Sequence, residues 1–256
     1  MRVRNRVSEL AARPTVVLRP TTDKNGVPLP VLKELNPQNR KAIKRRLAES
    51  TANFIDPTLA AGGAEATTVM PPTIANFDGV NSTTGILPPD TVGDVGPNHY
   101  VQNTNSSTSA ITAIGIYDKV LGTLLAPVFS MSSLFSSIGG ICASSDDGDP
   151  IVLYDSFADR WFISQFALGA DPFHQCIAIS QTGDPLGAYY AYDFVMPTDG
   201  DGRVNDYPHF GVWHDAYYMT DNQFDSGFTA FEGAGVFAYD RAKMVAGDPT
   251  ATYIYF

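Results

Sequence analysis

The chain has 256 residues, of which 44% are hydrophobic and only 17% are charged, a composition that excludes wholesale disorder and fits one large or two modest folded domains. Its formal net charge of −10 is unevenly divided, because residues 1–50 carry a net +8 and residues 51–256 a net −18. The acidic body lacks the basic face that phosphate binding needs, so we expect no nucleic-acid partner.

Residues 1–50 are expected to form a basic N-terminal arm with one short helix. Asn36 is placed to cap this helix, Pro37 would be its first residue, and Ala42, Ile43 and Leu47 would share one side. Its Lys and Arg cluster is compatible with nucleic-acid or anionic-membrane binding, but we favour a solvated helix. No apolar run follows the basic start, so no signal peptide is visible, and no stretch approaches the length of a membrane span.

Residues 51–76, rich in Gly, Ala, Thr and Pro, predict a linker. From about residue 77 the chain consists of short β-branched and aromatic runs separated by turn residues, which predict strands. Three modules follow one another, at about residues 90–140, 149–196 and 206–256. Equivalent strands recur every 56 to 63 residues or so. Alignment of the second strands places three residues at one position, Tyr100, Trp161 and Tyr217. Alignment of the third strands does the same for Tyr117, Ser180 and Tyr239.

A sheet of four short antiparallel strands cannot bury both faces alone, but such sheets cover one another when they stack around an axis, as in a β-propeller. Three aromatic pairs suit strands that are flanked by sheets on both sides, namely Trp161–Phe162, Tyr189–Tyr190 and Tyr217–Tyr218. We therefore expect an all-β, propeller-like fold of about three four-stranded blades within residues 77–256. A single β-sandwich is the competing fold. Because propellers have roughly four to eight blades, we expect an incomplete propeller that is truncated at its C-terminus.

The body contains two cysteines, Cys142 and Cys176. They are either two buried thiols or one disulfide that closes a loop of about 35 residues, worth roughly 3–4 kcal/mol on the chain-entropy relation. We predict the disulfide, because the rest of the body has the character of an extracellular protein.

Acidic residues after position 50 are almost all Asp, the exceptions being Glu65 and Glu232. Asp favours turns whereas Glu favours helices, so this bias indicates loops and oxygen-rich cation sites. Two acidic loops directly precede a module and are candidate calcium sites. Their ligands would be Asp146, Asp147 and Asp149 in the first loop, and Asp199, Asp201, Asn205 and Asp206 in the second. Solvated Asp/Gly turns are the alternative, since the second loop lacks the bidentate Glu of an EF-hand.

Motifs of the common catalytic classes are missing from the sequence, including G-x-S-x-G, H-E-x-x-H, the P-loop and G-x-G-x-x-G. His209 and His214 are five residues apart on a strand and its turn, so we expect no shared site. A sialidase-type propeller would need three converging arginines. The body has only Arg160, Arg203 and Arg241, and the first and last of these fall in different turns of the repeat. These observations favour a protein that is not an enzyme.

A family resemblance rests on several long runs of the body. They include PPDTVGDVGPNHYVQ, DGDPIVLYDSFADRWFISQFA, QCIAISQTGDPLGAYY and NDYPHFGVW. Over roughly residues 74–250 the chain resembles a group of large, secreted, mostly uncharacterised bacterial proteins that are described as β-propeller-like, often with adhesion or sorting modules appended. The resemblance implies an extracellular or cell-surface β-repeat protein and brings no catalytic residues with it.

The sequence therefore predicts an extracellular binding or scaffold module of the β-propeller type, whose partner is a glycan or a surface protein. Exposed Tyr and Trp at strand ends can stack on sugars, and the acidic surface discourages anionic partners. The alternative is a secreted glycoside hydrolase, or another hydrolase of polysaccharides, whose active site lies largely outside this chain.

Overall fold

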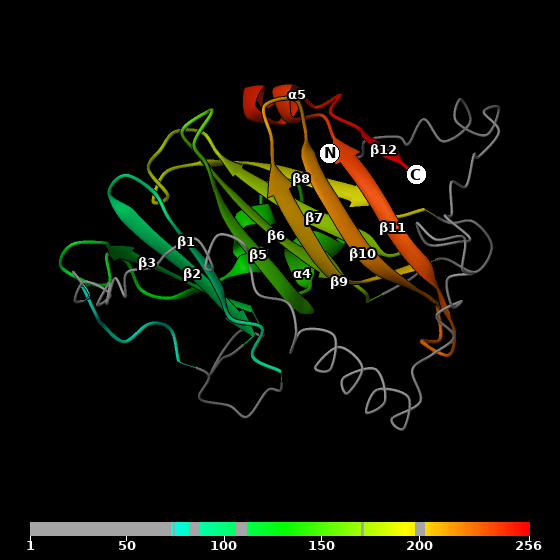
Figure 1. Cartoon of the computed structure of the whole chain (residues 1–256), viewed down its shortest axis with the longest axis horizontal. Coiled ribbons are helices and arrows are strands. Elements are labelled where there is room, and N and C mark those ends of the chain that lie inside the picture. The colour runs from blue at the N-terminus through cyan, green and yellow to red at the C-terminus, as the bar shows by residue number, and fades with distance from the viewer. Residues whose placement is uncertain (1–72, 74, 82–87, 106–111, 170–171, 198–202) are drawn as a thin grey trace, which may run out of the picture. The chain divides into compact units, whose positions relative to one another are not determined.

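The computed structural model describes residues 73, 75–81, 88–105, 112–169, 172–197 and 203–256. In this part of the chain the dominant elements are strands, which form three four-stranded antiparallel sheets with their strands in consecutive order (Figure 1). The prediction of an all-β repeat of four-stranded sheets is thereby confirmed. The predicted basic arm, residues 1–50, and nearly all of the predicted linker lie outside the described residues.

Each sheet is a meander of neighbours in sequence. The first sheet consists of β1 (Val92–Val95), β2 (His99–Asn105), β3 (Thr112–Asp118) and β4 (Phe129–Ser130). The second consists of β5 (Gly148–Asp155), β6 (Arg160–Ala167), β7 (His174–Ser180) and β8 (Tyr189–Val195). The third consists of β9 (Arg203–Val212), β10 (Tyr217–Asp225), β11 (Phe231–Tyr239) and β12 (Tyr253–Tyr255).

Three short helices that the sequence did not predict connect these strands. The 3-10 helix η1 (Met131–Phe135) and α4 (Ile141–Ser144) lie between the first and second sheets. Helix α5 (Arg241–Ala246) lies between β11 and β12. The side chain of Asp240 accepts a hydrogen bond from Lys243 N at the start of α5, and Gly247 ends it in the left-handed conformation that glycine adopts readily.

The predicted registers are confirmed by the strand pairing. The aromatic residues that the sequence aligned all stand at the start of a second strand, as Tyr100 in β2, Trp161 in β6 and Tyr217 in β10. Tyr100 pairs with Tyr117, and Tyr217 pairs with Tyr239. The backbone N–H of Trp161 donates to Ser180 Oγ at 2.8 Å. The three sheets therefore repeat one pairing scheme.

The second sheet is packed on both faces. Trp161 belongs to a core that the second sheet shares with Val101, Ile114 and other residues of the first sheet. Phe162, the next residue, belongs to the core shared with the third sheet, where its ring centroid lies 4.9 Å from that of Tyr217. An aromatic pair on one strand thus fills two different cores, because successive side chains point to opposite faces.

The predicted disulfide is confirmed: Cys142 of α4 is bonded to Cys176 of β7. Both residues are fully buried in the core between the first and second sheets. The bond therefore ties the connection between these sheets to a central strand of the second sheet.

A residue in or just before the first strand of each sheet has a left-handed backbone although it is not glycine. The residues are Asp90, Asp149 and Tyr207, with φ of 39°, 47° and 52°. They are equivalent, because the residues two places further on pair with matching positions of the second strands, as Val92 with Asn103, Ile151 with Ser164 and His209 with Thr220. In the second and third sheets the pairing shifts register here, as at a β-bulge. The first strands of the three sheets approach one another at this point.

Candidate functional site

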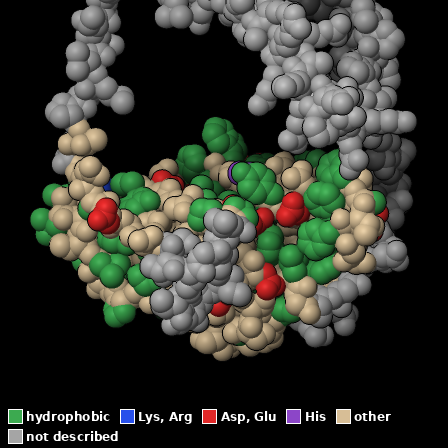
Figure 2. Space-filling model, turned by 90° about the horizontal axis from the view of Figure 1, so that it is seen from below, with side chains coloured by type: hydrophobic (Ala, Val, Ile, Leu, Met, Phe, Trp, Pro, Cys, Tyr) green, Lys and Arg blue, Asp and Glu red, His purple; other side chains and the backbone are tan. Residues whose placement is uncertain are grey.

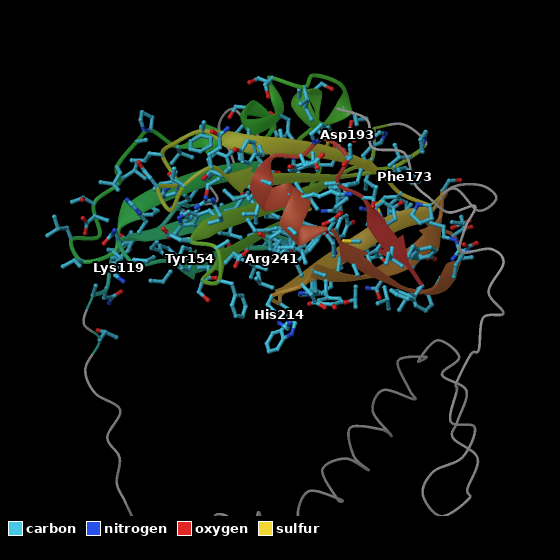
Figure 3. All side chains as sticks on the ribbon, turned by 90° about the horizontal axis from the view of Figure 1, so that it is seen from above. Lys119, Tyr154, Phe173, Asp193, His214 and Arg241 are labelled. Carbon is cyan, nitrogen blue, oxygen red and sulfur yellow. A yellow bond between two sulfur atoms is a disulfide. The ribbon has the colours of Figure 1, made fainter. Side chains whose placement is uncertain are left out.

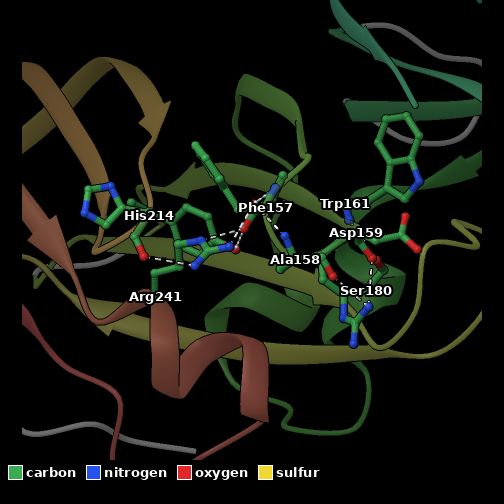
Figure 4. Close-up of polar contacts among 10 residues, drawn as sticks. Phe157, Ala158, Asp159, Trp161, Ser180, His214 and Arg241 are labelled. Atoms are coloured by element: carbon green, nitrogen blue, oxygen red, sulfur yellow. Dashed lines mark hydrogen bonds and ion pairs between the residues drawn. The ribbon is translucent and has the colours of Figure 1, made fainter. Parts of the chain in front are cut away.

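A buried carboxylate, Asp155 at the end of β5, organises the contact between the second and third sheets. Its side chain is completely buried and forms a bidentate ion pair with Arg241, the first residue of α5. Arg241 Nε donates to Oδ2 at 2.7 Å and Nη2 donates to Oδ1 at 2.9 Å. The Tyr217 hydroxyl also donates to Oδ2, at 2.8 Å. Figure 4 shows the ion pair and its surroundings.

Asp155 also fixes the turn that follows it. Its Oδ1 accepts hydrogen bonds from the backbone N–H groups of Phe157 at 3.0 Å and Ala158 at 3.2 Å. Burial alone raises the pKa of this carboxyl, but the donors of Arg241 and Tyr217 outweigh burial, so the pKa lies below its usual value. The carboxylate is therefore charged and satisfied, which makes it a structural anchor rather than a proton donor.

Arg241 also contacts a second turn, between β9 and β10. Its Nη1 donates to the backbone oxygen of His214 at 3.1 Å, in the turn between β9 and β10. Its guanidinium carbon also lies 5.7 Å from the ring centroid of Phe157, within cation–π range. One ion pair therefore holds the β5–β6 turn and the β9–β10 turn in a fixed relation.

Exposed rings stand on these two turns. Phe157 is 57% exposed and Trp213 is 55% exposed, and their ring centroids lie 6.0 Å apart at an interplanar angle of 77°. The ring of His214 lies 5.4 Å from that of Trp213. Figure 3 shows His214 projecting from the edge of the molecule, near Arg241. We call Phe157, Trp213 and His214 the aromatic ledge.

A second feature is a small crevice where the first strands of the three sheets meet. It has a volume of about 110 Å³ and is lined by three equivalent tripeptides, residues 90–92, 149–151 and 207–209. Asn105 Nδ2 donates to Asp90 at 2.7 Å, and Tyr207 N donates to Asp149 at 2.9 Å. The left-handed residues of the repeat thus converge on one point.

Carboxylates at this crevice repel one another. Burial, together with the nearby charges of Asp90 and Asp206, raises the pKa of Asp149 from 3.8 to about 6. Burial and the charge of Asp90 also raise the pKa of Asp206. A carboxyl with the pKa of Asp149 can donate a proton near neutral pH. However, the crevice is far smaller than the roughly 300 Å³ of the smallest usual ligand pockets.

A third feature is a cleft of about 540 Å³ beside the first sheet. Phe77, Tyr100 and Lys119 are among its lining residues. Two of its polar side chains are used within the protein, because Lys119 Nζ donates to Gly96 O and the Gln102 amide bonds both backbone groups of Val80. The cleft therefore offers apolar surface with few free polar groups.

The described candidate calcium ligands do not gather at one point, although the charge of Asp206 acts on Asp149 beside the crevice. Asp146 accepts from the backbone and hydroxyl of Ser132, and Asp147 accepts from Leu168 N. Asn205 instead donates to Gln175. No group of three or more His, Cys, Asp or Glu side chains is placed to hold a metal ion in the described ranges. Asp199 and Asp201 lie outside the described residues, and calcium binding by either loop stays a prediction.

The three arginines of the body bind separate partners and form no common clamp. Arg160 donates to the backbone oxygens of Ala158 and Asp159, Arg203 pairs with Glu232, and Arg241 pairs with Asp155. His209 lies on β9 against the ring of Tyr207, and His214 lies on the ledge.

Two sites were not found from the sequence. The Asp155–Arg241 pair joins residues 86 positions apart, and no local pattern links them. The contact of His174 Nδ1 with Asp193 Oδ1 joins neighbouring strands of the second sheet. The aromatic ledge had a partial signal, because Phe157 stands in a predicted turn, where a large aromatic side chain is seldom buried, and Trp213 ends the predicted strand HFGVW.

Comparisons with models of protein families, with curated proteins and with solved structures found no match to this chain. Among the described residues, no helix combines the length and apolar character that crossing a membrane requires. The function must therefore be argued from the geometry of the candidate sites.

Proposed function

We propose that this protein is an extracellular glycan-binding module with a propeller-like stack of sheets, and that it binds neutral sugars on the aromatic ledge. The observation that carries the proposal is the exposed pair Phe157 and Trp213, held rigid from beneath by the buried Asp155–Arg241 ion pair. The propeller-like arrangement is supported by three sheets of one register that pack in sequence order, with their first strands close together.

Sugar rings suit such a surface because their C–H faces are apolar and their edges carry hydroxyl groups. Trp213 and Phe157 offer flat apolar area at little cost in side-chain entropy. In the part of the chain that is described, the Trp213 indole N–H and the His214 ring have no hydrogen-bond partner, so both polar edges can meet sugar hydroxyls.

The charge of the body favours a neutral glycan. Residues 51–256 carry a net −18, and a surface of this sign repels sulfated or uronic polymers. On the face seen in Figure 2, Asp and Glu side chains recur among apolar ones, while Lys and Arg are scarcely visible. The Cys142–Cys176 disulfide supports an oxidising, extracellular setting.

A glycan array with the purified protein tests this proposal, followed by calorimetric titration of the best neutral oligosaccharide. We expect Trp213→Ala to weaken binding about five- to thirtyfold, since a lost stacking contact is worth roughly 1–2 kcal/mol. Phe228→Ala is the matched control, because Phe228 is 52% exposed in a different turn. Failure to bind any neutral glycan, or equal losses in both variants, contradicts the proposal.

The alternative function, hydrolysis of polysaccharides, has one supporting observation, the raised pKa of Asp149 beside two further carboxyls. Because the crevice around it is too small for a sugar ring, we assign no reaction to it. The absence of turnover of fluorogenic glycosides by a protein that still binds the array glycan would separate binding from hydrolysis.

A further inference from the structure

The peptide bonds that follow the three left-handed residues of the repeat differ in chemistry. They are the bonds Asp90–Thr91, Asp149–Pro150 and Tyr207–Pro208. The bond after Asp149 combines a side-chain carboxyl with a prolyl amide, whereas its two equivalents each have only one of these groups. In an Asp–Pro bond the carboxyl reaches its own carbonyl carbon through a five-membered ring, and the tertiary prolyl nitrogen accepts a proton more readily than an ordinary peptide nitrogen.

The backbone at Asp149 is strained. Its φ is 47°, although a residue that precedes proline prefers an extended backbone with negative φ. Such a conformation persists only where the surrounding structure holds it, and it is common at functional sites. Pro150 is buried, the pairing of β5 with β6 shifts register here, and Asp149 Oδ2 accepts from Tyr207 N at 2.9 Å. Cleavage of the bond after Asp149 would release this strain.

Two other Asp–Pro bonds in the described part of the chain lack this geometry. Asp184 and Asp248 also precede proline, but neither has a positive φ. The Asp184 carboxylate accepts from Leu186 N at 2.9 Å, and the Asp248 carboxylate accepts from Thr250 N at 2.7 Å. Both carboxylates are thus used by ordinary turns, so these two bonds are internal references for the bond after Asp149.

A second carboxyl stands beside that of Asp149. The side chains of Asp149 and Asp90 interact directly, and Asn105 Nδ2 donates to Asp90 Oδ2 at 2.7 Å. Two carboxyls in contact do not both ionise, so the pair holds one nucleophilic carboxylate and one acid. The surrounding crevice, with a volume of about 110 Å³, is too small for an outside substrate, but a bond of the chain itself needs no pocket.

We propose that the protein cleaves its own Asp149–Pro150 bond, in a hydrolysis whose only other reactant is water. The carboxylate of Asp149 bonds its own carbonyl carbon and forms a five-membered cyclic anhydride. The carbon–nitrogen bond to Pro150 breaks, and the nitrogen takes the proton of the Asp90 carboxyl and becomes a secondary amine. Water then opens the anhydride and leaves two carboxyl groups on Asp149, so nothing is oxidised or reduced. This activity does not depend on glycan binding, because the aromatic ledge stands on other turns.

The disulfide makes this cleavage easy to recognise by mass spectrometry. Cys142 lies before the broken bond and Cys176 lies after it, so the two pieces stay linked until the disulfide is reduced. We expect the purified whole chain, incubated in neutral buffer without reductant, to gain the mass of one water molecule. After reduction the same sample should separate into residues 1–149 and 150–256, with no products from cleavage after Asp184 or Asp248.

Single variants separate the roles of the two carboxyls. Asp149→Asn tolerates the left-handed backbone but lacks the carboxylate, so it should abolish cleavage. Asp90→Asn keeps an acceptor for Asn105 and removes the acid, so the rate should fall about a hundredfold. Asp184→Asn is the matched control and should cleave at the wild-type rate. A wild-type chain that stays whole, equal cleavage after Asp184, or cleavage of Asp149→Asn at the wild-type rate overturns the proposal.

Discussion

Replacement of Asp155 by Asn tests the anchor beneath the aromatic ledge. The carboxylate is fully buried and accepts five hydrogen bonds, two of them from Arg241 and one from Tyr217. An amide keeps the volume and one acceptor, but its NH₂ group would face donors at the position of Oδ2, and Arg241 would lose its counter-charge. Removing one partner of a buried pair costs about 3–5 kcal/mol. We expect about 3 kcal/mol, because the bonds to Phe157 N and Ala158 N can survive.

Urea unfolding followed by circular dichroism measures this loss, with Asp215→Asn as the control. Asp215 lies in the β9–β10 turn, is exposed and accepts only from the Tyr218 hydroxyl, so its change should stay within about 0.5 kcal/mol. Because the pKa of Asp155 is lowered, its contribution is complete above the ordinary value of 3.8 and is lost as the pH falls towards the lowered pKa. A loss below about 1 kcal/mol at neutral pH, smaller than a single satisfied buried hydrogen bond to a charge, would refute the reasoning.

Three further predictions follow from other parts of the molecule. Reduction of the Cys142–Cys176 disulfide should lower the free energy of unfolding by about 3–4 kcal/mol, and an unchanged urea midpoint with reductant would contradict this. The pKa of Asp149 is raised to about 6, so its ionisation removes stability as the pH rises from 3.8 through about 6. Asp149→Asn should therefore stabilise the protein by about 1 kcal/mol at pH 7, after allowance for solvent screening, and should have no effect below pH 3.8. Asn tolerates the left-handed backbone there, and melting temperatures that keep a constant gap across this range would exclude the effect. Calcium bound by the loop of Asp199 and Asp201 should raise the melting temperature, and the double variant Asp199→Asn, Asp201→Asn should abolish this rise. A chelator that leaves the melting temperature of the wild type unchanged would count against calcium binding.

The repeat of the fold could be predicted because its signal is local. Large aromatic residues at the start of β2, β6 and β10 lie at one register position, and the pairing confirms it. Strands β1 and β4 were not predicted, because VGDV contains a Gly and an Asp and β4 has only two residues. Strand β9 is longer than expected, since the bulge at Tyr207 interrupts the alternation that defines a strand in sequence.

The site could not be predicted in the same way, because its parts come from different sheets. Asp155 ends a strand of the second sheet, and Arg241 starts a helix after β11 of the third. Only the packing of the two sheets brings them within 2.7 Å. The sequence could show an aromatic residue in one turn, Phe157, and another at the end of a predicted strand, Trp213, but it could not show that one ion pair aligns both turns.

The burial of the two residues in each aromatic pair depends on how many sheets pack against the sheet that carries it. Trp161 and Phe162 fill separate cores because the second sheet has a sheet on either side. Tyr217 and Tyr218 have the same form, but only Tyr217 is buried, so the expectation of cover on both sides is not met at Tyr218. Burying a large apolar side chain stabilises a protein by roughly 1.5–3 kcal/mol relative to leaving it in solvent. An exposed residue at a position where its equivalents are buried does not gain this free energy. Tyr218 therefore keeps apolar surface in solvent that its equivalent in the second sheet, Phe162, buries against the third sheet.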